Sequence, residues 1–187
     1  MDAKDSMDRA VAAYLEGDTR VATAEFERAR GAIARTGRAD LLARAELMQC
    51  AARVASLVFE PCEGFEKLRQ DAAPAERAYA DYLAAHIQPQ DIALLPPAQR
   101  AAAGASAATL PDIGDPLSRL VAAGVLFRSG NASPAVMSLA VDTASAQGWR
   151  RPLLAWLGVQ LLRAEKAGDA AEAERLRRRI GVVEQGK

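Results

Sequence analysis

Apolar residues recur along most of the chain at the spacing of an α-helix. In the segment 19–34 they stand four, three and four positions apart, so that they share one helix face: Ala22, Phe26, Ala29 and Ile33. A second helical pattern precedes this one and ends near Glu16. Gly17 and Asp18 separate the two patterns. Glycine suits the backbone conformation that ends a helix, and aspartate caps the start of the next. The pattern therefore predicts two antiparallel helices joined by a tight turn.

Glycine turns between helical patterns return in the C-terminal part of the chain. The residues that form these turns and pack the helices behind them are Gly130, Ala135 and Leu139 in one predicted hairpin, and Gly168, Asp169 and Ala173 in the other. β-branched residues never alternate with polar ones over the length of a strand. Alanine, the best helix former, occurs instead in runs. We therefore expect an all-α protein built from antiparallel helical hairpins.

The first hairpin resembles part of a tetratricopeptide repeat. Its pattern GD-x3-A-x3-F-x2-A is carried by Gly17, Asp18, Ala22, Phe26 and Ala29, and it is similar to the turn and second helix of that family. Near the C-terminus, Trp156, Leu157 and Gly158 are similar to the opening of a repeat. The resemblance covers about half of the chain. It implies stacked hairpins that form a short solenoid with a surface for protein partners.

The middle of the chain loses this repeat pattern. We predict a long helix from Ala39 to between positions 56 and 59, a short amphipathic piece over 63–71 and another helix over 75–85. Residues 89–115 are rich in proline, glycine and alanine, which indicates an irregular connection with a short helix over 97–103. The predicted organisation is thus an N-terminal helical half, 1–88, this connection, and a C-terminal helical half, 116–187. Both one continuous solenoid and two lobes fit the pattern.

Composition narrows the range of partners. The chain of 187 residues carries 24 basic and 24 acidic side chains, so it has no general field that would attract nucleic acid, and we expect no nucleic-acid partner. The basic run at 175–180 is interleaved with acidic residues, which favours ion pairs on a helix surface. No apolar run reaches the roughly 18–20 residues that a membrane span needs. The start of the chain is charged and does not look like a signal peptide.

The two cysteines, Cys50 and Cys62, are the sharpest local feature. If the long helix ends near Ser56, the chain has six residues in which to return, and Pro61 favours a turn there. A disulfide is then feasible, because it needs Cα atoms roughly 4.4–6.8 Å apart. Two buried thiols are the alternative. A disulfide would indicate a periplasmic or otherwise exported protein, and we would then expect that a signal or lipid anchor has been removed.

Catalytic and metal-binding patterns are lacking. The single histidine, His86, has no neighbour in sequence that would orient it, and the spacing of the two cysteines matches no zinc site. No nucleophile elbow, phosphate-binding loop or dinucleotide-binding glycine pattern occurs. We therefore expect a non-enzymatic protein without metal or cofactor.

Four aromatic residues remain as candidate anchors for a partner: Tyr79, Tyr82, Trp149 and Trp156. Packing in the core is the alternative use of the tryptophans, whereas tryptophan and tyrosine are also favoured where proteins bind each other. The function expected is a protein- or peptide-binding module, an adaptor exported to the bacterial envelope as a periplasmic protein or lipoprotein. A cytoplasmic adaptor or secretion chaperone of the same fold is one alternative. A helical domain that binds a small molecule or lipid is another, and a closed apolar pocket would favour it over an open groove.

Overall fold

The computed structural model describes residues 2–104 and 106–186, and this part of the chain contains ten α-helices, three short 3-10 helices and no strand. In chain order they are α1 (Ala3–Glu16), α2 (Thr19–Ala34), α3 (Ala39–Ala55), α4 (Glu63–Glu66), η1 (Arg69–Asp71), α5 (Pro74–Leu83), η2 (Pro89–Leu94), α6 (Pro97–Ala103), η3 (Leu110–Asp112), α7 (Pro116–Arg128), α8 (Pro134–Gln147), α9 (Arg150–Lys166) and α10 (Ala170–Gln185). The all-α prediction is confirmed for these residues. The long middle helix ends at Ala55, at the short end of the predicted range.

The chain reverses at each of the three predicted glycine turns. Gly17, Gly130 and Gly168 all adopt positive φ, at 97°, 78° and 70°, which glycine tolerates without a steric penalty. The helices on either side of each turn pack against each other, and α8 also packs against α9. The caps follow the sequence as well: the carboxylates of Asp18 and Asp169 accept hydrogen bonds from the first turns of α2 and α10. Paired antiparallel helices are therefore confirmed.

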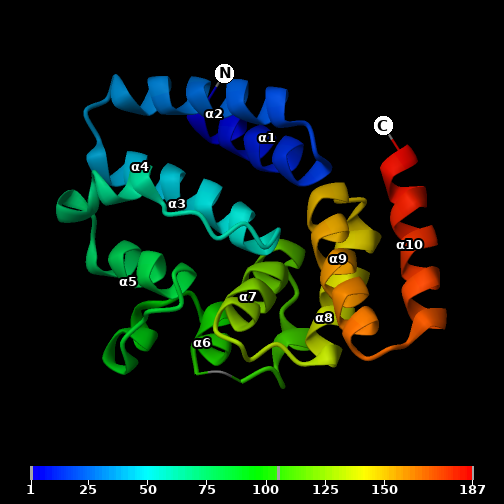
Figure 1. Cartoon of the computed structure of the whole chain (residues 1–187). Helices are drawn as coiled ribbons and strands as arrows, with labels where there is room; N and C mark the ends of the chain where they lie inside the picture. Colours follow the sequence, from blue (N-terminus) through cyan, green and yellow to red (C-terminus); the bar gives the residue numbers. More distant parts are fainter. Residues whose placement is uncertain (1, 105, 187) are drawn as a thin grey trace.

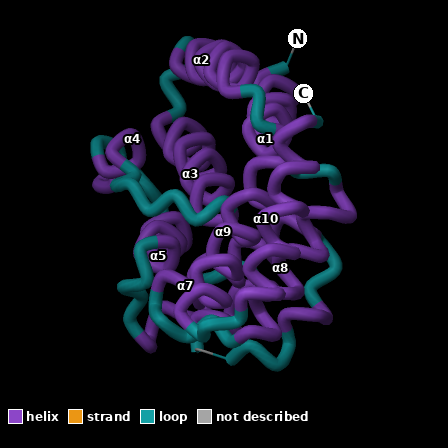
Figure 2. Tube along the Cα trace, turned by 45° about the vertical axis from the view of Figure 1, so that its right-hand side comes forward, coloured by secondary structure: helices purple, strands orange, loops and turns teal. Residues whose placement is uncertain are grey.

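The helices of the described residues pack around α3. Figure 1 shows α1 and α2 side by side, with α3 below them and α5 further from the N-terminal hairpin. Helices α8, α9 and α10 stand next to one another on the opposite side of the molecule, with α7 between them and α3. Figure 2, turned by 45°, shows the same neighbours. Helix α3 thus lies at the centre, in contact with α1, α2, α5 and α7.

Two groups of buried side chains hold this arrangement together. The smaller one joins α1, α2 and α3 around Phe26 and Ala29. The larger one draws on all three segments predicted from the sequence, with Tyr82 from the first, Leu110 from the irregular connection and Leu126 from the last, each 0% exposed. The predicted boundaries therefore do not separate two cores.

The C-terminal end of α3 is where the two sides of the molecule meet. Gly124 of α7 faces it so closely that a Cβ atom at position 124 would lie 2.3 Å from the carbonyl oxygen of Val54. The indole of Trp156, which is 0% exposed, donates a hydrogen bond of 3.1 Å to the carbonyl oxygen of Ala55. This bond satisfies a carbonyl that the end of α3 leaves without a helical partner. The ring of Phe127 packs edge-on against Trp156, with centroids 5.7 Å apart.

The predicted packing residues on the hairpin helices are buried to different degrees. Ala22, Phe26, Ala29 and Ala173 lie in the core, and Leu139 packs against it. Ala135 is exposed, and its neighbour Val136, 3% exposed, takes the inward position, so the predicted register of α8 is wrong by one residue. Gly158 allows no close helix contact, because a Cβ atom there would meet nothing within 4 Å. The close approach occurs at Gly124 instead.

Candidate functional site

An apolar groove lies between α3, α5 and the end of η2. Its volume is about 470 Å³, it opens to solvent along one side, and the residues that line it are Arg44, Leu47, Met48, Ala75, Glu76, Tyr79, Leu94, Leu95 and Pro96. One wall comes from α3, where Arg44, Leu47 and Met48 follow one another at the spacing of a helix stripe. The second wall is the first half of α5.

The groove has a buried floor and exposed apolar edges. Leu47 and Leu95 are 3% and 1% exposed and close the bottom. Met48 and Leu94 are 41% and 43% exposed, and they are two of the five exposed large hydrophobic residues in the described part of the chain. Such residues gathered around one depression are typical of a binding surface, whereas isolated ones are ordinary.

An ion pair joins the two helical walls. The Nε atom of Arg44 lies 2.6 Å from Oε1 of Glu76, which links α3 to α5 at the edge of the groove. The second oxygen of Glu76 is buried and has no hydrogen-bond partner among the described residues. The pair neutralises both charges, and the groove as a whole is apolar.

Tyr79 is the predicted anchor that lies in this groove. Its side chain is half-buried, and burial raises the pKa of its hydroxyl above the ordinary value, so it is neutral at physiological pH. Its ring stacks on that of Tyr82, with centroids 6.0 Å apart.

Tyr82 itself is 0% exposed. Its hydroxyl donates to the side-chain oxygen of Gln99 in α6, and the amide nitrogen of Gln99 donates to the carbonyl oxygen of Ser118 in α7, at 3.0 Å. Tyr82 thus joins α5 to α6 and α7, and its ring is covered by the protein.

The two tryptophans lie away from the groove. Trp149 is the residue before α9 and is half-buried against the core. Trp156 is fully buried, which agrees with the alternative that the tryptophans pack in the core. The structure therefore leaves Tyr82 and Trp156 no surface for a partner, because both rings are enclosed, and it brings Tyr79 together with residues that the sequence analysis did not single out.

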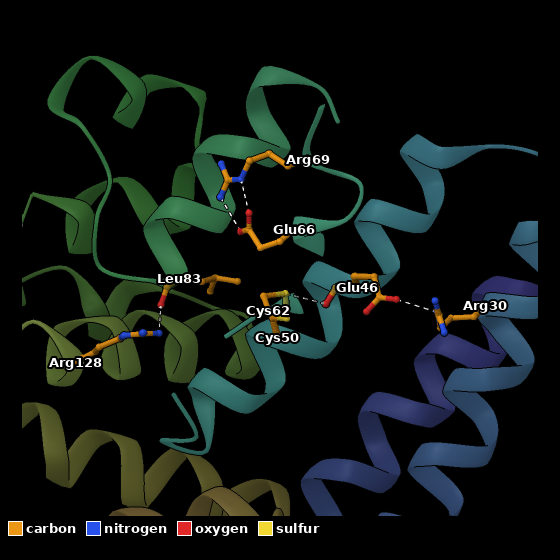
Figure 3. Close-up of a disulfide and its surroundings, with 8 residues drawn as sticks. All are labelled: Arg30, Glu46, Cys50, Cys62, Glu66, Arg69, Leu83 and Arg128. Carbon is orange, nitrogen blue, oxygen red and sulfur yellow. Dashed lines mark hydrogen bonds and ion pairs between the residues drawn. A yellow bond between two sulfur atoms is a disulfide. The ribbon is translucent and has the colours of Figure 1, made fainter. Parts of the chain in front are cut away.

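The disulfide between Cys50 and Cys62 is present, with Cα atoms 6.0 Å apart (Figure 3). The return that it requires begins right after α3. Leu57 has a positive φ of 59°, and the amide of Val58 donates back to the carbonyl of Arg53 at 2.9 Å, which turns the chain sharply. Because α3 ends early, at Ala55, the chain can return to Cys50, and the two cysteines form a disulfide and are not free thiols.

A buried carboxylate lies beside this disulfide. Glu46, on the same helix as Cys50, is 5% exposed, and Nε of Arg30 lies 2.9 Å from its Oε1 (Figure 3). Burial raises the pKa of Glu46, while the positive charge of Arg30 opposes that shift. Gly64 packs directly on the carboxylate, since a Cβ atom there would lie 2.1 Å from Oε2. The segment after Cys62 thus covers Glu46.

The arginine run near the C-terminus forms ion pairs, as the interleaved acidic residues indicate. Arg175 lies 2.7 Å from Glu172, and Arg177 lies 2.5 Å from Glu165 across the α9–α10 hairpin. These pairs lie on the helix surface.

Comparison with protein-family models, with curated proteins and with solved structures finds no match to this chain. Within the residues that the structure describes, no helix is both long and apolar enough to cross a bilayer.

The groove was missed by the sequence analysis for an identifiable reason. Leu94, Leu95 and Pro96 belong to the irregular connection, whose composition indicates turns and says little about which helices it will pack against. A signal was nonetheless present: two adjacent leucines inside a proline-rich stretch are unusual for a solvated linker. Met48 was hidden because it lies at the edge of a broad apolar face of α3.

Proposed function

We propose that this protein is a non-enzymatic helical scaffold that binds an apolar peptide segment of a protein partner in the groove between α3 and α5. The single observation that carries the proposal is the pairing of a buried floor, Leu47 and Leu95, with exposed apolar edges at Met48 and Leu94. Transfer of such side chains out of water supplies the binding energy. Methionine adapts its shape to different apolar partners.

The open side of the groove favours a peptide over a small molecule. A small-molecule site encloses most of its ligand, whereas this depression is bounded by α3, α5 and η2 and open beyond them. A peptide can fill it with one or two apolar side chains while its backbone stays at the surface. The ion pair of Arg44 and Glu76 at the edge would contact the polar part of the same peptide.

The proposed setting is the bacterial envelope, where the protein would act as an adaptor. The Cys50–Cys62 disulfide supports this setting, because disulfides persist in oxidising compartments such as the periplasm and are rare in the cytosol. The proposal includes that the hairpins at Gly17, Gly130 and Gly168 are divergent relatives of tetratricopeptide repeats. Their turn chemistry and antiparallel pairing support that relationship.

Selection of peptides on the folded protein tests the proposal. A display library of random twelve-residue peptides is panned on the oxidised protein, and the Kd of the strongest peptide is measured by fluorescence anisotropy. We expect apolar residues to be enriched, and Met48→Glu to weaken binding by about tenfold or more, because a carboxylate would be desolvated in the groove.

The matched control is Val182→Glu, which places the same charge on an exposed valine of α10 away from the groove. This variant is expected to bind the peptide like the unchanged protein. If selection yields no peptide, or if both variants bind it equally well, the groove is not the binding site. Circular dichroism of each variant verifies that both remain folded.

A further inference from the structure

The disulfide connects the two walls of the groove through a short path. Cys50 lies on α3, two residues beyond Met48, and Cys62 is the residue before α4. From there the chain reaches α5 at Pro74, which begins the second wall. The disulfide is therefore a covalent bond between the helix of one wall and the segment that leads to the other.

That segment has little structure of its own. Between the end of α3 at Ala55 and the start of α5 at Pro74 lie only α4, of four residues, and η1, of three. Helices this short are not stable by themselves. The position of the segment must therefore be set by its contacts, and Figure 3 shows the disulfide at its start, against α3.

Further contacts of this segment, made by Phe65 and Arg69, link it to the core and to α5. Phe65 is 0% exposed in the core, and the guanidinium of Arg69 lies over its ring, 5.2 Å from the centroid. Arg69 also pairs with Glu66 at 2.7 Å and reaches Asp81 of α5 at 2.9 Å. Because Arg69 links the segment to α5, movement of the segment would displace α5, which forms the second wall of the groove.

We propose that the Cys50–Cys62 disulfide is a redox-sensitive cross-link that holds α5 against α3 and thereby sets the peptide affinity of the groove. This inference rests on the proposed function. The reductant is a dithiol. One of its thiolates attacks the sulfur of Cys62, the S–S bond breaks, and Cys50 leaves as a thiolate that takes up a proton.

The second thiolate of the reductant then attacks the mixed disulfide, which frees Cys62 as a thiol and leaves the reductant as a disulfide. Two electrons and two protons have passed to the protein. Attack falls on Cys62 because its side chain is half-buried, whereas Cys50 is 8% exposed on the inner side of α3. Cys62 is therefore the more accessible of the two cysteines.

Hydrogen exchange and peptide binding test the inference together. The whole protein is compared in its oxidised form, in dithiothreitol, and as the Cys50→Ser/Cys62→Ser double variant, with the redox state verified by mass. We expect exchange of the α5 amides to accelerate by about tenfold on reduction and in the double variant, while the amides of α9 are unchanged. The selected peptide is expected to bind about tenfold more weakly in both cases.

A matched control separates this effect from a general loss of stability. Phe26→Leu weakens the smaller core, which joins α1, α2 and α3, and leaves the disulfide intact. This variant is expected to leave exchange of α5 and the peptide affinity unchanged. Equal acceleration of α5 in Phe26→Leu would overturn the inference, as would identical exchange and affinity in the two redox states.

The exchange measurement uses no ligand, so the two proposals can fail separately. If no peptide binds the oxidised protein, the proposed function fails, and the response of α5 to reduction still decides whether the disulfide holds that helix. If peptides bind but with the same Kd before and after reduction, the proposed function stands and redox control of the groove is overturned.

Discussion

At the scale of single residues, two non-glycine residues adopt the left-handed backbone conformation that favours glycine. Leu57 and Ala85 have φ values of 59° and 60°. Each follows a helix, α3 or α5, at the position where the chain turns away. Ala85 carries the turn after the second wall of the groove, where the amide of His86 donates to the carbonyl of Asp81 at 2.8 Å. Glycine is the residue that such a turn favours.

Replacement of Ala85 by glycine is expected to stabilise the protein. The left-handed conformation costs a residue with a Cβ atom about 1–2 kcal/mol, and the greater freedom of glycine in the unfolded chain offsets part of the gain. We expect the free energy of unfolding, measured in urea, to rise by about 0.5–1 kcal/mol. The converse change, Gly130→Ala, introduces a Cβ atom at a φ of 78° in open space and should lower it. Two changes of the same sign would contradict this account.

Glu46 gives the protein a pH dependence that can be isolated by one substitution. Burial raises the pKa of its carboxyl in the folded state above the unfolded value. Its contribution to stability is therefore fully present below the unfolded pKa, roughly 4.3, and is lost as pH rises through the folded pKa. Relative to Glu46→Gln, the unchanged protein should therefore lose stability as the pH rises above about 4. Urea unfolding at several pH values measures the difference, and a difference that is flat or grows with pH would contradict the assignment.

At the scale of elements, the packing of α7 on α3 depends on one missing side chain. Gly124 lies in the middle of α7, where glycine normally weakens a helix. The backbone of Val54 approaches it so closely that a methyl group has no room. The two helices that join the N-terminal and C-terminal sides of the core thus meet at this residue.

Gly124→Ala is expected to destabilise the protein by about 2–3 kcal/mol, the upper part of the range for an overpacked core, in spite of the better helix propensity of alanine. Thermal and urea unfolding measure the change. Gly158→Ala in α9 is the matched control, because a Cβ atom there meets nothing within 4 Å. It should be neutral or slightly stabilising. If the two substitutions changed the free energy of unfolding equally, helix propensity alone would account for the change, and the close contact with Val54 would contribute nothing.

At the scale of the whole molecule, Arg151 at the start of α9 holds the N-terminal hairpin. Its Nε donates to the carbonyl oxygen of Tyr14 at 2.6 Å, and its Nη2 donates to the hydroxyl of Thr19 at 2.7 Å. Its guanidinium also lies 4.3 Å from the centroid of the Tyr14 ring. One side chain therefore bonds both sides of the first turn and links it to α9.

Arg151→Ala is expected to lower the free energy of unfolding by about 1–3 kcal/mol, the range for a charged hydrogen-bond donor together with a cation–π contact. Exchange of the α1 and α2 amides should accelerate more than that of α7. Arg163→Ala, an exposed arginine at the other end of α9, serves as the control and should change neither quantity. If α1 and α2 exchange as before, Arg151 does not hold the hairpin.

Local signals explain what the sequence predicted well. The turns at Gly17, Gly130 and Gly168 and the caps at Asp18 and Asp169 are short-range features, so neighbouring residues suffice to predict them. The sequence showed that the disulfide was feasible, and the position where α3 ends settled it. The register of α8 is wrong because Ala135 and Val136 are both apolar, and only contacts with other helices decide which of them turns inward. The groove and the close approach at Gly124 join segments far apart in the chain, and no local pattern contains that information.

The bond from Arg151 to Tyr14 spans 137 residues of sequence. During synthesis on a ribosome, at about 5–20 residues per second, the first hairpin waits roughly 7–30 s before its docking site on α9 exists. Over that interval the face of Tyr14 that α9 later covers stays open to water or to chaperones. The last fifth of the chain thus completes the environment of the first two helices, and a nascent chain that stalls before residue 151 leaves the tip of that hairpin without its partner.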